Sequence, residues 1–245
     1  MAVLSISKQS ASARKSALSR GTATSDFLKS SKAIFLSEES KCEWEINKYE
    51  IIPNSSWIKT QELSSCESKK AICIARNSYE KGLDRLFFIW KKVTNKKPDW
   101  ELLIFSEKEG YFDLDNLILK NDLSKNVRIL DFEKNILNSY LQSSIYVMTS
   151  RDEGMPMVLI EAMTVGLPIV AFDCPIGPKS LIENNINGFL IKDNDLEEFV
   201  SKTIQLIDDE DIRKSFGKNS ILLSRKYNAD EVLLKWKTFF EQIEV

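Results

Sequence analysis

The sequence contains no histidine, and its four cysteines, Cys42, Cys66, Cys73 and Cys174, form no CxxC pair. Structural zinc sites need several Cys or His ligands at close spacing, so the sequence argues against such a site. The missing histidine also removes catalysis by Ser-His-Asp and Cys-His groups. At this length, irregularly spaced cysteines predict the reduced thiols of a cytoplasmic protein and no disulfide framework.

Long apolar runs and a strong charge of one sign are missing as well. No run approaches the roughly 20 apolar residues that a membrane-spanning helix needs. The formal net charge of −2 gives no general attraction to nucleic acid, so we expect no nucleic-acid partner. Any attraction to an anion must therefore be local.

The first residues differ in composition from the rest of the chain. No acid precedes Asp26, whereas Lys8, Arg14, Lys15 and Arg20 stand among many serines and alanines. This composition is typical of a transit peptide, of a basic arm that touches a membrane surface, or of a disordered leader. We expect a disordered leader over residues 1–30 and build no function on it.

From residue 71 onward, apolar runs alternate with segments of helical periodicity. The predicted strands are 71–76, 101–106, 127–130, 145–150, 168–173 and 188–193, and the predicted helices between them are 80–93, 113–123, 134–143, 156–165 and 180–185. Three further helical segments finish the chain, the first with Asp195 as its N-cap. Strands that are almost wholly apolar indicate a parallel sheet covered on both faces. The sequence therefore predicts a doubly wound α/β fold.

The segment before this alternation is shorter and less regular. Strands are predicted at 31–37 and 49–56, with a short helix between them and a polar linker over 57–70. We therefore divide the chain into a leader at 1–30, a small part with a linker at 31–67, and one large domain at 68–245.

Two cations follow the first strand of the large domain. Arg76 ends strand 71–76, and Lys81 opens the next helix. Ligands of open parallel sheets bind beyond the carboxyl ends of the strands, which is where both residues are expected. A guanidinium fork and an ammonium group suit a diphosphate, although each alone is more often a surface cation.

Two glutamates flank the start of helix 156–165. Glu153 precedes that helix and Glu161 lies in its second turn. Gly154 lets the backbone approach a ligand, and the helix start at Pro156 offers N–H groups that favour a phosphate. Carboxylates only accept hydrogen bonds, so beside a phosphate they would bind sugar and ribose hydroxyls. The alternative, a solvated loop acid and an ordinary polar helix position, stays open.

FDLDN (112–116) contains a D-x-D pattern similar to a metal-binding motif. It stands at the start of a predicted helix, so we interpret Asp113 as an N-cap.

Several motifs together resemble a known family. They are IPN (52–54), ARNSYEKG (75–82), EGMPMVLIEAM (153–163), GLPIVAFD (166–173) and GPKSLIENNINGFLI (177–191). In this order and spacing they resemble retaining glycosyltransferases of family 4, also called glycosyl transferases group 1, which have the GT-B fold. The resemblance covers about residues 31–245. It implies that 68–245 is the C-terminal, Rossmann-like donor-binding domain and that 31–67 is a remnant of a truncated N-terminal acceptor domain with the linker.

The resemblance also implies roles for individual residues. Arg76 and Lys81 would contact the pyrophosphate of a UDP-sugar or GDP-sugar donor, and Glu153 would hold hydroxyls of the transferred sugar. Glu161 would bind the ribose hydroxyls. The backbone at Gly154, Met155 and Pro156 would line the sugar and phosphate. Transfer would proceed with retention and without a metal or other cofactor.

The sequence departs from the family pattern at three places. Ser106 and Asp131 stand where relatives usually carry glycine, the latter near the expected base. Most of the acceptor domain, which holds the family's usual catalytic histidine, has no counterpart here.

The function predicted from these features is transfer of a sugar to a glycan or lipid-linked acceptor in surface polysaccharide biosynthesis. Two alternatives stay open: a silent or partner-dependent donor-binding fragment, and a sugar-nucleotide epimerase, which would need a histidine-bearing site. A partner chain or self-association would replace the missing half. We expect a cytoplasmic location, with peripheral contact at the inner face of the cell membrane as a further option.

Overall fold

The computed structural model describes residues 4–5, 33–42, 44, 46–133 and 135–242. The chain divides into two compact units. The large unit is Ser56–Lys226, and the small unit combines Met1–Ser55 with Tyr227–Val245. The leader predicted at 1–30 lies outside the described residues except for positions 4–5.

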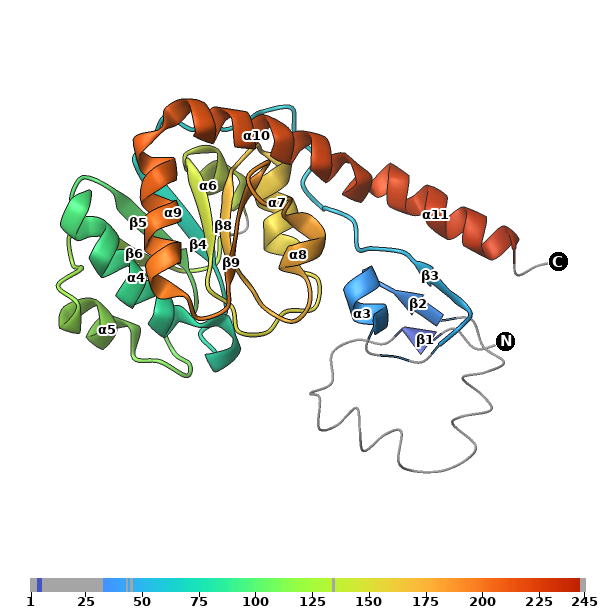
Figure 1. Ribbon diagram of the computed structural model, residues 1–245, viewed down its shortest axis with the longest axis horizontal. Coiled ribbons are helices and arrows are strands. Elements are labelled where there is room, and N and C mark those ends of the chain that lie inside the picture. Colours follow the sequence, from blue (N-terminus) through green and yellow to red (C-terminus); the bar gives the residue numbers. More distant parts are fainter. Residues whose placement is uncertain (1–3, 6–32, 43, 45, 134, 243–245) are drawn as a thin grey trace. The chain divides into compact units, whose positions relative to one another are not determined.

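The large unit is built on a six-stranded sheet (Figure 1). Its strands are β4 (Lys70–Ile74), β5 (Glu101–Phe105), β6 (Val127–Leu130), β7 (Ile145–Met148), β8 (Ile169–Asp173) and β9 (Gly188–Lys192). They lie in the order β6-β5-β4-β7-β8-β9, and every pairing is parallel. The strand order reverses between β4 and β7, which makes this a doubly wound, Rossmann-like sheet as predicted.

Helices connect successive strands and complete the unit. They are η1 (Tyr79–Lys81), α4 (Leu83–Lys96), α5 (Leu114–Lys120), α6 (Leu137–Leu141), α7 (Met157–Thr164), α8 (Pro178–Leu181), α9 (Leu196–Asp208), α10 (Glu210–Ser224) and η2 (Arg225–Tyr227). The N-caps predicted at Asp113 and Asp195 are confirmed, because their carboxylates accept the backbone N–H of Asn116 and Glu198, each at 3.0 Å. The sequence predicts Pro156 as the first residue of its helix, but α7 begins one residue later, at Met157, and Pro156 is its N-cap.

Side chains alternate between the two faces of the sheet. Cys73 and Val147 join α4 and α9 in one apolar cluster, whose centre includes the fully buried Trp90. Tyr146, the neighbour of Val147, points to the other face, where its ring stacks on Tyr140 of α6. Helices therefore cover both faces of the sheet, and the strands lie within a close-packed apolar core.

The segment predicted as a polar linker at 57–70 packs tightly on the large unit. Ser64 donates its hydroxyl to the carbonyl of Ser143 at 2.5 Å and its N–H to that of Val165 at 2.9 Å. Cys66 is buried and its carbonyl accepts from Arg213. Periodicity could not reveal this packing because hydrogen bonds to distant backbone groups hold the segment.

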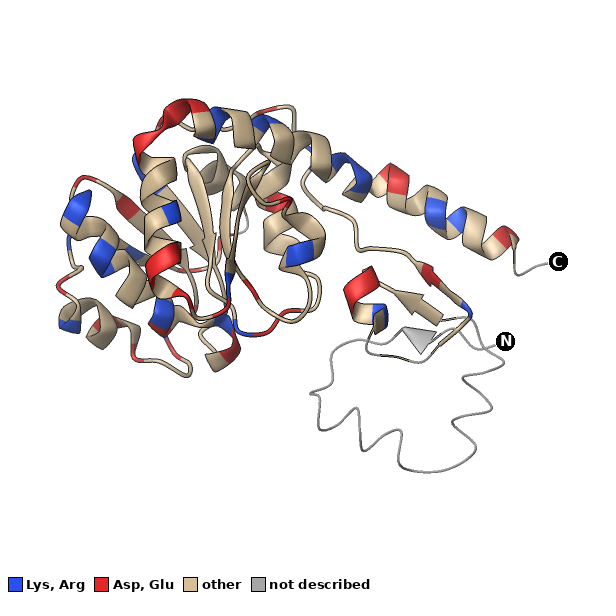
Figure 2. Cartoon of the chain, viewed as in Figure 1, with Lys and Arg blue, Asp and Glu red and all other residues tan. Residues whose placement is uncertain are grey.

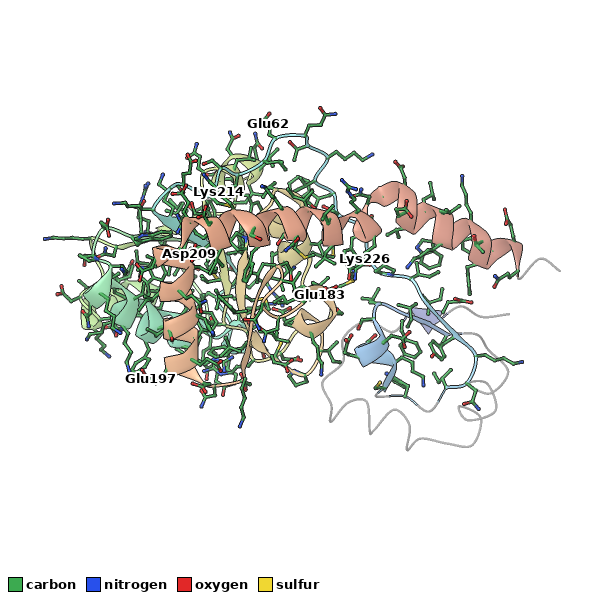
Figure 3. All side chains as sticks on the ribbon, turned by 45° about the horizontal axis from the view of Figure 1, so that its top comes forward. Glu62, Glu183, Glu197, Asp209, Lys214 and Lys226 are labelled. Carbon is green, nitrogen blue, oxygen red and sulfur yellow. The ribbon has the colours of Figure 1, made fainter. Side chains whose placement is uncertain are left out.

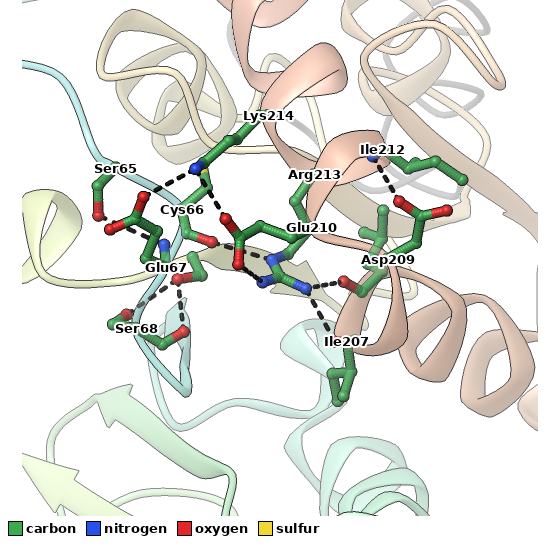
Figure 4. A network of polar contacts seen from close by, with 12 residues as sticks. Ser65, Cys66, Glu67, Ser68, Ile207, Asp209, Glu210, Ile212, Arg213 and Lys214 are labelled. Carbon is green, nitrogen blue, oxygen red and sulfur yellow. Dashed lines mark hydrogen bonds and ion pairs between the residues drawn. The ribbon is translucent and has the colours of Figure 1, made fainter.

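Arg213 of α10 is the centre of that attachment (Figure 4). Its buried guanidinium donates to the carbonyl of Cys66 at 2.9 Å and to the carbonyls of Leu206 and Ile207 at 2.6 and 2.8 Å. The last two carbonyls belong to the final turn of α9, where helix carbonyls lack partners within the helix. Arg213 thus caps α9 and fixes the segment before β4.

The small unit has its own three-stranded parallel sheet. Its elements are β1 (Leu4–Ser5), β2 (Ala33–Phe35), β3 (Tyr49–Ile51), α3 (Glu38–Cys42) and α11 (Ala229–Glu241). Ile34 and Ile52 pack with Val232 and Phe239 of α11. The observed division thus differs from the predicted one at 56–67, which belong to the large unit, and at 227–245, where the last helix covers apolar side chains of the small unit.

Acidic and basic residues are interspersed along the helices and loops of the large unit (Figure 2). Glu197 on α9 lies at the surface of the unit (Figure 3), whereas Lys214 on α10 pairs with Glu67 and Glu210, each at 2.7 Å. Within the described part of the chain, no helix is both long and apolar enough to span a membrane.

Candidate functional site

Two loops meet where the strand order reverses, at the carboxyl ends of β4 and β7. Gly82, in the loop after β4, has a φ of +62°, and a Cβ there would lie 2.1 Å from the carbonyl oxygen of Thr149. Thr149 follows β7 and donates its hydroxyl to the carbonyl of Gly82 at 2.9 Å. Only glycine permits this approach, which brings the residues around Gly82 against the loop 149–156.

Two arginines join the same loops. Arg85 is buried and donates to the carbonyl of Thr149 at 2.7 and 3.2 Å, while pairing with Asp193 after β9 at 2.7 Å. Arg151 pairs with Asp84 through two hydrogen bonds of 2.8 and 2.6 Å. Bidentate arginine pairs fix orientation as well as distance. The loops after β4, β7 and β9 therefore form one rigid rim.

Lys81 and Glu153 meet at this rim. The Lys81 ammonium lies 2.5 Å from the Glu153 carboxylate, and the side chains are 16% and 5% exposed. A carboxylate this buried needs a partner, and Lys81 supplies one. The predicted cation and the predicted acid are 72 residues apart in the chain. In the folded protein they are in direct contact.

The turn between Arg76 and Lys81 carries two further polar groups. Arg76 follows β4 by two residues and is exposed, and among the described residues its side chain has no ion-pair partner. Ser78 has a buried hydroxyl without a hydrogen-bond partner in the described part of the protein. Buried hydroxyls normally have partners. This turn therefore offers a cation and a hydrogen-bonding group that the protein itself does not use.

Glu161 of α7 is buried and both of its carboxylate oxygens accept hydrogen bonds. Oε1 accepts from the indole Nε1 of Trp57 at 2.7 Å, and Oε2 accepts from the Tyr140 hydroxyl at 2.8 Å. A polar residue on an exposed helix face would mainly contact water. Both donors to Glu161 instead come from other segments of the chain.

The two glutamates lie around the same residues of the sheet. The pKa of Tyr146, on β7, is raised well above its usual value by burial, and the charges of both Glu161 and Glu153 add to the effect. Cys73, on the neighbouring strand β4, has its pKa raised to about 12 by burial, with Lys81 and Glu153 close enough to act on it. The charges of both glutamates therefore act on Tyr146, whose hydroxyl bonds to Ile74, the last residue of β4.

A third loop supports the backbone that precedes α7. Gly177 has a φ of +107°, and a Cβ there would lie 2.6 Å from Pro156 and 2.8 Å from the carbonyl oxygen of Gly154. Met155 is buried between these residues. The backbone of 154–156 is thus held in place, at the N-terminus of α7, by the loop after β8.

No group of three or more Cys, Asp or Glu side chains within the described ranges is placed to hold a metal ion. The thiol of Cys174 is buried, and its pKa is raised to about 12 mainly by that burial.

The structure thus brings Lys81 together with Glu153, which precedes Gly154, Met155 and Pro156 at the start of α7. Glu161 lies in the second turn of that helix, and Arg76 lies exposed on the turn before Lys81. Sequence reasoning missed the residues that hold these groups: Trp57, Tyr140, Gly82, Arg85 and Arg151. Of these, only Gly82 carried a signal, because it follows Lys81 directly at a strand-to-helix turn.

The fold and the rim define a doubly wound domain with a candidate anion and hydroxyl site at its topological switch point. The model of the family glycosyl transferases group 1 matches residues 56–222. Because the match covers most of the chain, the chain belongs to this family.

Individual relatives agree with this assignment. The chain is 33% identical, over 84% of its length and 60% of the relative's, to an uncharacterized glycosyltransferase of Haemophilus influenzae. It is 36% identical to the amylovoran biosynthesis glycosyltransferase AmsD of Erwinia amylovora, over 69% of this chain and 47% of that one. The chain therefore spans about half the length of these relatives.

A solved structure shares the fold. A point mutant of TarM from S. aureus, in complex with fondaparinux, alpha-GlcNAc-glycerol and UDP, matches with a TM-score of 0.76 and 24% identity, over 85% of this chain and 43% of that one.

Proposed function

We propose that this chain provides the donor-binding part of a glycosyltransferase that moves a sugar from a UDP-sugar or GDP-sugar to a glycan or lipid-linked acceptor. The observation that carries the proposal is the meeting of Lys81 and Glu153 at the switch point, with Glu161 in the second turn of the helix that follows. Membership of the family and the relative named for amylovoran biosynthesis support a role in surface polysaccharide synthesis.

The proposed site divides its work between charge and hydrogen bonding. Arg76 and Lys81 bind the diphosphate and offset the negative charge that grows on the leaving nucleotide. The start of α7 and the backbone of 154–156 add N–H groups to the same anion. Glu153 accepts hydroxyls of the sugar, and Glu161 accepts hydroxyls of the ribose.

Further parts of the proposal rest on the family resemblance. Transfer proceeds with retention of the anomeric configuration and without a metal ion. The protein works in the cytoplasm, where it contacts the inner face of the cell membrane to reach a lipid-linked acceptor. A partner chain or a second copy supplies the acceptor-binding surface.

Nucleotide binding tests the proposal. Isothermal titration of the whole chain with UDP, GDP and ADP should give binding with UDP or GDP. A nucleotide at a hundredfold excess over its Kd should stabilise the fold by about 2.7 kcal/mol, seen as a higher Tm. Glu161→Ala should weaken binding by roughly 1.5–3 kcal/mol, the worth of hydrogen bonds to a charged group.

Glu62→Ala is the matched control, because Glu62 is exposed and its removal deletes the same charge. Circular dichroism checks that both variants fold. If no nucleoside diphosphate binds the wild-type chain, or if Glu161→Ala binds as well as Glu62→Ala, the proposed donor site is wrong.

A further inference from the structure

The two hydrogen-bond donors of Glu161 differ in how firmly the fold holds them. The Tyr140 hydroxyl and the Trp57 indole each occupy one carboxylate oxygen, at 2.8 and 2.7 Å. Tyr140 is fully buried, whereas Trp57 is 56% exposed. A ribose hydroxyl that binds Glu161 must therefore approach either the oxygen held by the buried Tyr140 or the oxygen held by the exposed Trp57.

Tyr140 is a fixed donor. Its ring stacks on Tyr146, with ring centroids 6.1 Å apart and planes inclined by 27°. The Tyr146 hydroxyl in turn bonds to the backbone N–H and carbonyl of Ile74, at 3.3 and 3.4 Å. Because Tyr140 is fully buried in a close-packed core, its hydroxyl has little room to leave Oε2.

Trp57 is a donor that can leave. It lies in the segment between β3 and β4, outside any helix or strand, and more than half of its surface is exposed. Its hydrogen bond to Oε1 is only partly buried, whereas the bond from Tyr140 to Oε2 is fully buried. When the indole swings away, its N–H is satisfied by water, so departure leaves no buried donor unpaired.

We propose that Trp57 is an exchangeable competitor for the nucleotide. On binding, a ribose hydroxyl takes the place of the indole N–H on Oε1 of Glu161, while Tyr140 keeps Oε2 and holds the carboxylate in position. Trp57 thereby sets the affinity for the nucleotide, and Tyr140 acts as a positioning residue. This inference rests on the proposed donor site.

Four conservative variants separate these roles in titrations of the whole chain with UDP or GDP, whichever binds the wild type more tightly. Trp57→Phe removes the competing N–H but keeps an aromatic ring, so nucleotide affinity should rise about tenfold, equal to about 1.4 kcal/mol. Trp236→Phe, in the small unit, is its control and should change nothing. Tyr140→Phe should lower affinity about tenfold, whereas Tyr146→Phe, which removes a hydroxyl bonded to Ile74, should stay within about twofold.

A spectroscopic measurement follows the exchange directly. The chain has five tryptophans, and Trp57→Phe identifies the Trp57 indole N–H among the signals of a ¹⁵N-labelled sample. That signal should shift in Glu161→Ala without any nucleotide, because its acceptor is gone. Saturating nucleotide should move it in the wild type toward the position seen in Glu161→Ala.

The outcomes distinguish this inference from the proposed function. If the wild type binds nucleotide but Trp57→Phe binds no more tightly, or if the Trp57 signal stays in place on binding, the exchange is refuted and the donor site stands. If Tyr140→Phe binds like the wild type, the positioning role of Tyr140 is refuted. If no variant binds UDP or GDP while the Trp57 signal still shifts in Glu161→Ala, the donor site itself fails, and the exchange with it.

Discussion

At the scale of single residues, Lys81 and Glu153 form an ion pair that is largely buried. The two side chains are 16% and 5% exposed, so water hydrates neither charged group well, and the contact between them offsets that loss of hydration. Pairs of this kind contribute little to stability as a whole, but removing one partner leaves a buried charge alone. The pair therefore holds a cationic and an acidic side chain together at the rim, where we expect a ligand to exchange with them.

This arrangement makes a prediction for stability. Lys81→Met should lower the free energy of unfolding by about 3 kcal/mol, because the Glu153 carboxylate stays buried without its partner. Lys69→Met is the control, since Lys69 and Asp99 are 64% and 54% exposed and such surface pairs contribute about 0–1 kcal/mol. Urea denaturation measures both. Equal losses in the two variants would mean that Glu153 finds another partner.

The thiols give a second prediction at this scale. Burial raises the pKa of Cys73 and Cys174 to about 12 and also raises that of Cys66, whereas Cys42 is exposed. Because the thiolate is the reactive species, only Cys42 should react quickly with a thiol reagent at pH 8 in the folded protein. All four should react in denaturant. Rapid reaction of more than one thiol in the native state would contradict the observed burial.

The same pKa shifts determine how stability varies in alkaline solution. The usual thiol pKa is 9.0, and the folded-state values of Cys73 and Cys174 are higher. Burial therefore stabilises the fold as long as these thiols are protonated, and this contribution to the free energy of unfolding is fully present below pH 9. It is lost as the pH rises from about 9 toward about 12, because the unfolded chain releases the protons first.

At the scale of elements, the site depends on how closely two loops approach each other. Gly82 lies so near Thr149 that a Cβ would be 2.1 Å from the carbonyl oxygen. The loop before α4 and the loop before α7 are aligned by that contact, and Lys81 reaches Glu153 as a result. A change at one backbone position should therefore alter a site formed by side chains.

Gly82→Ala should destabilise the fold and also reduce nucleotide affinity, because the added methyl group forces the loops apart. Gly217→Ala is the matched control: its Cβ would lie 2.3 Å from the carbonyl oxygen of Gly166, between α10 and the end of α7. It should lower the Tm without a selective loss of nucleotide affinity. Titration with UDP or GDP below the Tm of each variant compares them. Equal affinities in the two variants would contradict a role for the Gly82 contact in the site.

The elements also show what the sequence could and could not predict. Local patterns predict the apolar strands and the caps at Asp113 and Asp195. The rule that ligands bind at the carboxyl edge of a parallel sheet predicts that Lys81 and Glu153 lie together. Trp57 and Tyr140 could not be predicted as partners of Glu161. Their hydrogen bonds span 104 and 21 residues, and neither a polar segment nor a short helix indicates which distant carboxylate it will contact.

At the scale of the whole molecule, the chain consists of one large unit that carries the candidate site and a small unit with a modest core. The small unit buries Ile34 and Ile52 on Val232 and Phe239 of α11, so these strands do have apolar neighbours within the chain. On α11, Leu233, Leu234 and Phe240 are 52%, 60% and 50% exposed. Neighbouring exposed apolar side chains of this kind favour association.

We therefore expect the protein to self-associate. Light scattering at working concentration should give a mass above that of a monomer, and Leu234→Glu should reduce it, because a charge on this surface opposes contact between copies. Leu119→Glu, at a residue of the large unit that is 71% exposed, is the control and should leave the mass unchanged. A monomer at all concentrations would contradict the expectation.

We propose that the rim at the reversal of the sheet order binds a nucleoside diphosphate through Arg76, Lys81 and the start of α7, with Glu161 on the ribose. A crystal structure of the whole chain with UDP or GDP tests it most directly. We predict the diphosphate within hydrogen-bonding distance of Arg76 and Lys81, and a ribose hydroxyl on Oε1 of Glu161. A nucleotide bound anywhere else, or one whose ribose leaves Glu161 in contact with Trp57, would contradict the account.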